Sequence, residues 1–86
     1  MTMRMLHKYE GQVFRHFKGD LYLLLGFAYH TETGEKMVIY KALYDECETY
    51  VRPYEMFAEL VPEGKENPTG QKFRFMYWQV ESVVSK

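Results

Sequence analysis

The segment spanning residues 21–52 constrains the fold more than any other part of the chain. Two apolar runs, residues 21–30 and 36–44, flank the polar connector 31–35, and residues 50–53 close the segment. Gly34 in the connector supplies the positive φ that hairpin loops need. The pattern predicts a β-hairpin that runs into a third pairing strand.

Similar arguments extend the prediction along the rest of the chain. Gly26, in the middle of the second strand, indicates a bulge or a bend. Met56, Phe57 and Leu60 recur at one-turn spacing, which predicts a single helical turn over residues 54–60 after Pro53 ends the strand before it. We expect strands at residues 12–17, 21–29, 35–43, 49–52 and 73–80. A short helix is the alternative for residues 73–80.

This order of elements predicts an all-β domain, specifically a five-stranded SH3-like small barrel with one helical turn before the last strand. We expect residues 1–8 to form a flexible leader and residues 9–86 to form a single small β-barrel domain. A chain of 86 residues has a thin core, because a domain this small buries only about 60–65% of its unfolded surface.

Composition excludes several classes of protein. The single Cys47 rules out an internal disulfide and a thiolate-rich zinc site, and it fits a reducing, cytoplasmic compartment. The N-terminus does not resemble a signal peptide, and the longest apolar run, residues 21–29, is too short for a membrane helix. A net charge of −1 argues against a nucleic-acid partner, and we expect no cofactor.

Short motifs occur in a fixed order along the chain, at residues 13–19, 30–35, 38–40, 43–44, 51–53 and 56–57. Together they resemble a family of small bacterial and phage-associated proteins known as domain of unknown function 1653. The similarity covers residues 9–61 and weakens from Glu63 onward. It implies a small all-β domain, often a whole protein and sometimes attached to nucleotide-processing enzymes, and it implies no established activity.

The chain carries more aromatic side chains than a thin core can hide, so some rings must be partly exposed. Aromatic-lined grooves recognise extended peptides in SH3-like domains, although a core plus scattered surface tyrosines is the equally weighted alternative. Arginine side chains beside such a face would bind carboxylate or phosphate. We predict an aromatic face of Tyr40, Tyr44, Tyr50 and Tyr54 with a cationic rim of Arg15, His30 and Arg52.

The rim residues have simpler interpretations that the sequence leaves open. Arg52 would instead pair with Glu32 or Glu35, and His30 would instead cap its turn. Cys47 lies among acidic residues, which do not favour a reactive thiolate, so a catalytic cysteine is disfavoured. We find no metal-ligand spacing and no catalytic set, and we expect the chain not to be an enzyme.

The sequence therefore favours a small binding module for an unknown protein or peptide partner, used as an accessory to a larger enzyme. The alternative is a site for a nucleotide or another small anion at one end of the barrel. That alternative requires Arg15, His30 and Arg52 to converge on one concavity. A homodimer contact through the methionines of the leader is a further expectation.

Overall fold

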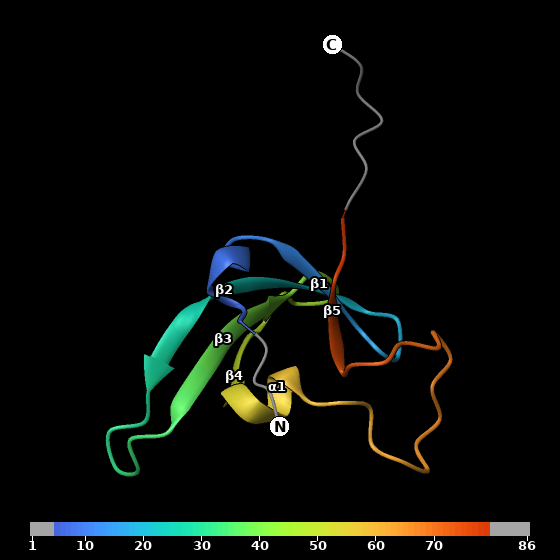
Figure 1. Ribbon diagram of the computed structural model, residues 1–86. Coiled ribbons are helices and arrows are strands. Elements are labelled where there is room, and N and C mark those ends of the chain that lie inside the picture. The colour runs from blue at the N-terminus through green and yellow to red at the C-terminus, as the bar shows by residue number, and fades with distance from the viewer. Residues whose placement is uncertain (1–4, 80–86) are drawn as a thin grey trace.

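Five antiparallel strands form one sheet in the order β4-β3-β2-β1-β5 (Figure 1). The structure is a computed structural model, and it describes residues 5–79. The sheet arches over a short helix that lies beneath it (Figure 1). The strands are β1 (Val13–His16), β2 (Leu21–Tyr29), β3 (Lys36–Ala42), β4 (Thr49–Pro53) and β5 (Phe75–Tyr77).

The predicted all-β class is confirmed, with five strands and a helical turn before the last of them. The helical turn is α1 (Tyr54–Ala58), and Pro53 precedes it, as expected of a residue that cannot extend a strand ladder. The bend predicted at Gly26 is also confirmed, because the register between β2 and β3 shifts between Leu24 and Gly26. The last strand is shorter than predicted, and residue 80 lies outside the described residues.

The sheet does not close into a barrel. β4 and β5 form its two edges: β4 pairs with β3, and β5 pairs with β1. The space that closure would use is filled by aromatic side chains. Phe57 of α1 stacks on Phe75 of β5 with ring centroids 4.1 Å apart, which holds the helix under the arch.

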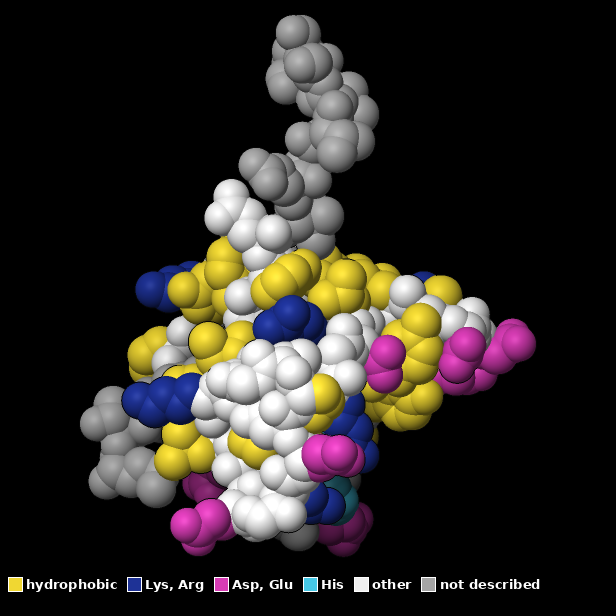
Figure 2. Space-filling model, turned by 90° about the vertical axis from the view of Figure 1, so that its right-hand side faces the viewer, with side chains coloured by type: hydrophobic (Ala, Val, Ile, Leu, Met, Phe, Trp, Pro, Cys, Tyr) yellow, Lys and Arg dark blue, Asp and Glu magenta, His cyan; other side chains and the backbone are white. Residues whose placement is uncertain are grey.

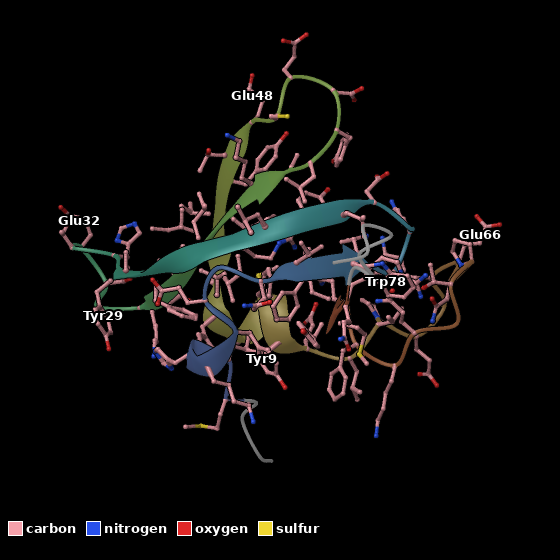
Figure 3. All side chains as sticks on the ribbon, turned by 90° about the horizontal axis from the view of Figure 1, so that it is seen from above. Tyr9, Tyr29, Glu32, Glu48, Glu66 and Trp78 are labelled. Atoms are coloured by element: carbon pink, nitrogen blue, oxygen red, sulfur yellow. The ribbon has the colours of Figure 1, made fainter. Side chains whose placement is uncertain are left out.

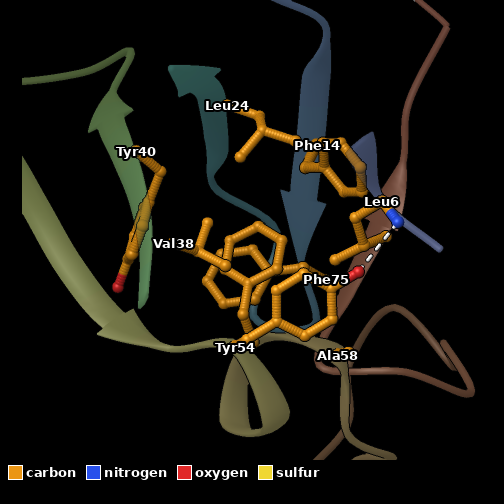
Figure 4. Packing of buried hydrophobic residues seen from close by; sticks show 9 residues of the cluster. Leu6, Phe14, Leu24, Val38, Tyr40, Tyr54, Ala58 and Phe75 are labelled. Carbon is orange, nitrogen blue, oxygen red and sulfur yellow. Dashed lines mark hydrogen bonds between the residues drawn. The ribbon is translucent and has the colours of Figure 1, made fainter. Parts of the chain in front are cut away.

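The core lies between the concave face of the sheet and α1 (Figure 4). Phe14 from β1 meets Phe57 edge to face, with ring centroids 5.5 Å apart. Aromatic burial of this kind supplies much of the apolar area that a small domain needs. The core residues are Leu6, Phe14, Leu24, Val38, Tyr40, Tyr54, Phe57, Ala58 and Phe75.

Part of the predicted leader belongs to this core. Leu6 is buried, and its backbone N–H donates a 2.9 Å hydrogen bond to the hydroxyl oxygen of Tyr54 (Figure 4). The 3-10 helix η1 (His7–Tyr9) follows directly. The expectation of a loose leader therefore does not hold for Leu6, and residues 1–4 lie outside the described residues.

Strand pairing assigns each side chain to one of two faces. Directly paired residues share a face, and successive residues alternate between faces. Tyr40 pairs with Leu24 and Tyr50 on the concave face, whereas Lys41 pairs with Leu23 and Thr49 on the outer face. Within residues 5–79, no helix has the length and apolar character needed to cross a membrane.

The long connection from α1 to β5 is fixed by polar contacts. Glu59 and Arg74 form an ion pair, and the backbone N–H of Arg74 donates to the Glu59 carbonyl over 2.9 Å. The buried side chain of Gln71 donates hydrogen bonds to the carbonyl oxygens of Arg15 and Phe73, at 3.0 Å and 3.1 Å. These contacts position β5 against β1.

Candidate functional site

Four tyrosines gather on the concave side at the end of the sheet where β2 begins and β3 ends. Tyr22 contacts both Tyr40 and Tyr44 edge to face, with ring centroids 5.3 Å and 5.5 Å apart. Tyr40 is 5.8 Å from Tyr50 on the edge strand β4. The cluster runs from the interior, where Tyr40 is 5% exposed, to solvent, where Tyr50 is 43% exposed.

The hydroxyl groups of these tyrosines are tied to one another and to an arginine. The hydroxyl oxygens of Tyr22 and Tyr44 lie 2.5 Å apart, within one hydrogen bond. Burial and this hydrogen bond raise the pKa of Tyr22 well above its usual range. Tyr40 accepts a 3.1 Å hydrogen bond from Nε of Arg52, which leaves its own hydroxyl proton free to donate.

Arg52 is a partly buried cation without an acidic partner in the described part of the chain. Its guanidinium lies 5.8 Å from the ring centroid of Phe75, and its Nε is used by Tyr40. The ion pair found within residues 5–79 joins Arg74 to Glu59, so Arg52 pairs with neither Glu32 nor Glu35. Its terminal nitrogens are donors suited to a carboxylate or a phosphate.

His16 adds a neutral donor to the same region. Burial, together with the positive charges of Arg74, Arg52 and Lys18, lowers the pKa of His16 to about 4, while the negative charge of Asp20 opposes this shift. Nδ1 accepts a 3.1 Å hydrogen bond from the Lys18 backbone N–H. We therefore assign the proton of the neutral ring to Nε2, which makes that nitrogen a donor.

The cluster is therefore rich in donors and cations and poor in acceptors. The charged groups that act on His16 are three cations and one carboxylate. Such an arrangement suits an acceptor-rich, negatively charged group, with an exposed aromatic ring beside it. We call the concave set Tyr22, Tyr40, Tyr44, Tyr50, Arg52 and His16 the tyrosine–arginine cluster.

Sequence reasoning placed Tyr40, Tyr44, Tyr50 and Arg52 together, and the structure does bring them together. It missed His16 and Tyr22. The signal for Tyr22 was its alternation with Leu24 on the same strand, which puts both side chains on the core face.

Arg15 does not join this cluster. It pairs with Leu21 and Met76 on the outer face of the sheet, opposite to the face that carries Arg52. Its Nε donates a 2.7 Å hydrogen bond to Gln71, and its guanidinium lies 4.0 Å from the ring centroid of Trp78. The predicted convergence of Arg15 with Arg52 is wrong, because the two side chains leave the sheet in opposite directions.

His30 lies at the far end of β2 and caps its turn. Its Nδ1 accepts hydrogen bonds from the backbone N–H groups of Glu32 and Thr33, at 3.1 Å and 3.4 Å. Figure 3 shows the turn that carries Glu32 well away from the β3–β4 hairpin that carries Glu48. The turn-capping alternative therefore describes His30, which does not contribute to a rim around Arg52.

Tyr54 belongs to the core and not to an exposed aromatic face. Its ring is buried, and it lies 5.8 Å from Phe27 and 6.2 Å from His7. A shallow hollow beside Tyr54 is lined by Glu35, Lys36 and Glu55. The prediction that Tyr54 presents its ring to a partner is wrong, because Tyr54 is the first residue of α1 and points under the sheet.

The tyrosine–arginine cluster borders an open strand edge. The Ala42 N–H donates to the Glu48 carbonyl, so these two residues form a hydrogen-bonded pair across β3 and β4. Because hydrogen-bonded pairs alternate along an antiparallel ladder, the backbone groups of Tyr50 and Arg52 also point toward β3. The backbone N–H groups of Thr49 and Val51 then point away from the sheet. Both residues are exposed, as is Tyr50 between them. This edge is an available pairing surface next to Arg52.

No metal centre accompanies the cluster. Residues 5–79 contain no group of three or more His, Cys, Asp or Glu side chains able to hold a metal ion. Cys47 is an exposed free thiol in the turn between β3 and β4, where its φ is 55°. The chemistry that the described residues offer is recognition through donors, cations and aromatic rings.

Comparison with known proteins gives a family and a fold. Residues 12–77 match the model of a family described as a protein of unknown function, DUF1653. A crystal structure of a DUF1653 protein from Bordetella bronchiseptica is 33% identical, with a TM-score of 0.67, covering 95% of this chain and 100% of that one. Comparison with curated proteins gives no match.

Proposed function

The chain belongs to the DUF1653 family, and for this member we propose a role as a binding module that recognises an extended, acidic peptide segment of a partner protein. The peptide would pair with the open edge of β4 and place a carboxylate on Arg52. The observation that carries the proposal is the position of Arg52, a cation without an acidic partner in residues 5–79, beside an unpaired strand edge.

The backbone of β4 supports pairing with an added strand. Thr49 and Val51 offer outward N–H and C=O groups, and Pro53 offers a carbonyl and no N–H. Strand addition to an exposed sheet edge draws affinity from these main-chain hydrogen bonds and specificity from alternate side chains. The side chains that alternate onto the concave face here are Tyr50 and Arg52.

The side chains support an acidic ligand. A carboxylate can accept hydrogen bonds from the terminal nitrogens of Arg52, which Tyr40 holds in place through Nε. The exposed ring of Tyr50 offers apolar contact to the residue beside that carboxylate. Within the described residues, Arg52 forms no ion pair with an acidic side chain.

A small anion is the second candidate ligand. It is favoured by the free hydroxyl proton of the Tyr22–Tyr44 pair and by Nε2 of His16, donors that lie farther from the edge of β4 than Arg52 does. A phosphorylated molecule would use these donors together with Arg52. This version of the site uses neither Arg15 nor His30.

The proposal extends to the cellular setting. We place the protein in a reducing bacterial cytoplasm, which suits its exposed free thiol. We propose a non-enzymatic role as an accessory to a larger enzyme, because the cluster supplies recognition groups without an activated nucleophile or a metal centre among residues 5–79.

Fluorescence polarisation can test the proposal. The probes are labelled peptides of alternating Val and Thr with one central Glu, together with the same peptides carrying Gln instead. Binding of the Glu peptide with at least about tenfold preference over the Gln peptide, lost in Arg52→Gln, is the expected result. Absence of binding to either peptide would contradict the proposed function.

A second pair of variants separates the two candidate ligands. Thr49→Pro removes an outward N–H at the first residue of an edge strand, where proline is tolerated, and Thr49→Val is the matched control that keeps it. Peptide binding should fall in Thr49→Pro alone. A thermal shift with ATP or inorganic phosphate that needs Arg52 and ignores Thr49→Pro would favour the small-anion site.

A further inference from the structure

The outer face of the sheet is mostly apolar, and the Glu10 side chain reaches it near Gly26. The core cluster and α1 lie on the opposite, concave side. An antiparallel sheet with one solvated face normally alternates apolar and polar residues, but β2 and β3 carry apolar residues on both faces. The outer set includes Leu21, Leu23, Ile39, Val51 and Met76.

These side chains form one continuous surface. Strand register places Ile39 beside Val51, and Leu23 beside Val13. Val51 is 61% exposed, and Trp78 at the β5 end is 38% exposed. Figure 2 shows hydrophobic side chains gathered along the upper part of the molecule, where the outer face meets the β5 edge. Leu21, Leu23, Ile39 and Met76 are partly exposed. Apolar side chains gathered on one solvent-facing surface mark an interaction site.

From this face we infer that the protein forms a homodimer in which the outer faces of two copies pack sheet against sheet. Five strands about 4.8 Å apart, with a longest strand of nine residues, give a face of at most about 700 Å². A stable interface buries about 800 Å² on each partner. A second sheet covers this whole breadth, whereas a single extended peptide covers one strip of it.

Charge on the face also suits a second copy. The strands place two cations there, Arg15 and Lys41, and the carboxylate of Glu10 lies beside Gly26 on the same face. Arg15 is already held by Gln71 and Trp78, and the long stem of Lys41 can carry its ammonium to the rim of the contact. A net charge of −1 per chain opposes association little.

This association is independent of the peptide site. Two sheets that pack face to face leave their strand edges open. Each copy would keep its β4 edge and its tyrosine–arginine cluster, which lies on the concave side. The two inferences can therefore fail separately.

Sedimentation equilibrium tests the dimer. In a reducing buffer, which prevents cross-linking through Cys47, the wild type should show twice its 10.4 kDa mass at about 100 μM, well above a micromolar dissociation constant. Val51→Lys should sediment as a monomer. The matched control is Tyr29→Lys, which places lysine at a 67% exposed position on the concave side of β2. It should remain a dimer.

Trp78 provides a second readout, because it is the single tryptophan and lies at the margin of the outer face. Acrylamide should quench wild-type fluorescence at least about twofold less than that of Val51→Lys at the same concentration, since burial removes the ring from solvent. A monomeric wild type at about 100 μM, or a Val51→Lys variant as dimeric as the wild type, would overturn the inference. Circular dichroism confirms that each variant is folded.

Discussion

Nε of Arg52 donates a hydrogen bond to the hydroxyl oxygen of Tyr40 over 3.1 Å, and this contact orients the guanidinium on the concave face. The two residues come from neighbouring strands, β4 and β3, but they are not directly paired in register. The diagonal contact leaves the terminal nitrogens of Arg52 available, and the guanidinium lies 5.8 Å from the ring centroid of Phe75. A buried hydroxyl thus positions the cation that we assign to ligand binding.

Removing that hydroxyl should weaken both the fold and the site. In Tyr40→Phe we expect the free energy of unfolding to fall by about 1 kcal/mol, the usual net contribution of one hydrogen bond. Urea denaturation measures this loss. Tyr50→Phe is the control, because Tyr50 is 43% exposed, and it should change stability by less than about 0.5 kcal/mol. Equal losses in both variants would contradict the role given to the Tyr40 hydroxyl.

Gln71 should be a stability determinant of the β1–β5 edge. Its side chain accepts from Nε of Arg15 over 2.7 Å and donates to two carbonyl oxygens. Gln71→Leu leaves those three groups without this partner, so we expect a loss of about 2–3 kcal/mol in urea denaturation. Gln12→Leu, at an exposed position, should be nearly neutral. A Gln71→Leu variant as stable as Gln12→Leu would show that water replaces the amide.

Much of the strand pattern was predictable because it depends on local sequence. β2 occupies the predicted residues 21–29, bounded by turns that contain Gly19 and Gly34. Whether the two edge strands pair with each other was not predictable in this way. Whether β5 pairs with β1 alone or also closes onto β4 depends on how α1 and Phe75 fill the arch, which is a property of tertiary packing.

The candidate site was predictable in part for the same reason. Alternation along β3 and β4 places Tyr40, Tyr50 and Arg52 on one face once Tyr40 pairs with Tyr50. Which face a residue of β1 shares with a residue of β4 depends on three successive strand pairings, β1 with β2, β2 with β3 and β3 with β4. Those pairings put Arg15 on the face opposite to Arg52. Leu6 shows a similar limit, because it joins a core built from distant residues and its backbone N–H donates to the Tyr54 hydroxyl.

Stability should fall as the pH drops below the ordinary pKa of histidine. Burial holds the pKa of His16 at about 4 in the folded protein, whereas an unfolded histidine has a pKa of about 6.5. Between these values the unfolded chain binds more protons, so the stability contributed by neutral His16 is present above pH 6.5 and is lost as pH falls toward 4. NMR titration of the His16 ring measures the midpoint directly.

A matched variant isolates this contribution from that of the carboxylates. His16→Asn keeps an oxygen able to accept the Lys18 N–H but does not titrate. Its unfolding free energy should decline less steeply between pH 6.5 and 4 than that of the wild type. Parallel profiles, or a ring midpoint near 6.5, would mean that His16 is solvated and that the surrounding cations do not act on it.

At alkaline pH the Tyr22–Tyr44 pair should govern stability. The folded pKa of Tyr22 is raised by burial and by its hydrogen bond to Tyr44, while an unfolded tyrosine ionises near pH 10. Above about pH 10 the unfolded chain therefore loses its proton first. The stabilisation from neutral Tyr22 is complete below that pH and is lost as pH rises toward the folded pKa. Urea denaturation between about pH 8 and 11 should show this decline.

Tyr22→Phe should flatten that profile, because the variant has no hydroxyl to ionise at this position. At neutral pH it should lose about 1 kcal/mol, since the Tyr44 hydroxyl loses its 2.5 Å partner. Tyr29→Phe serves as the control, because Tyr29 is exposed and lies at the opposite end of β2 (Figure 3). If Tyr22→Phe and the wild type lose stability in parallel above pH 10, the hydroxyl pair does not control the alkaline limit of the fold.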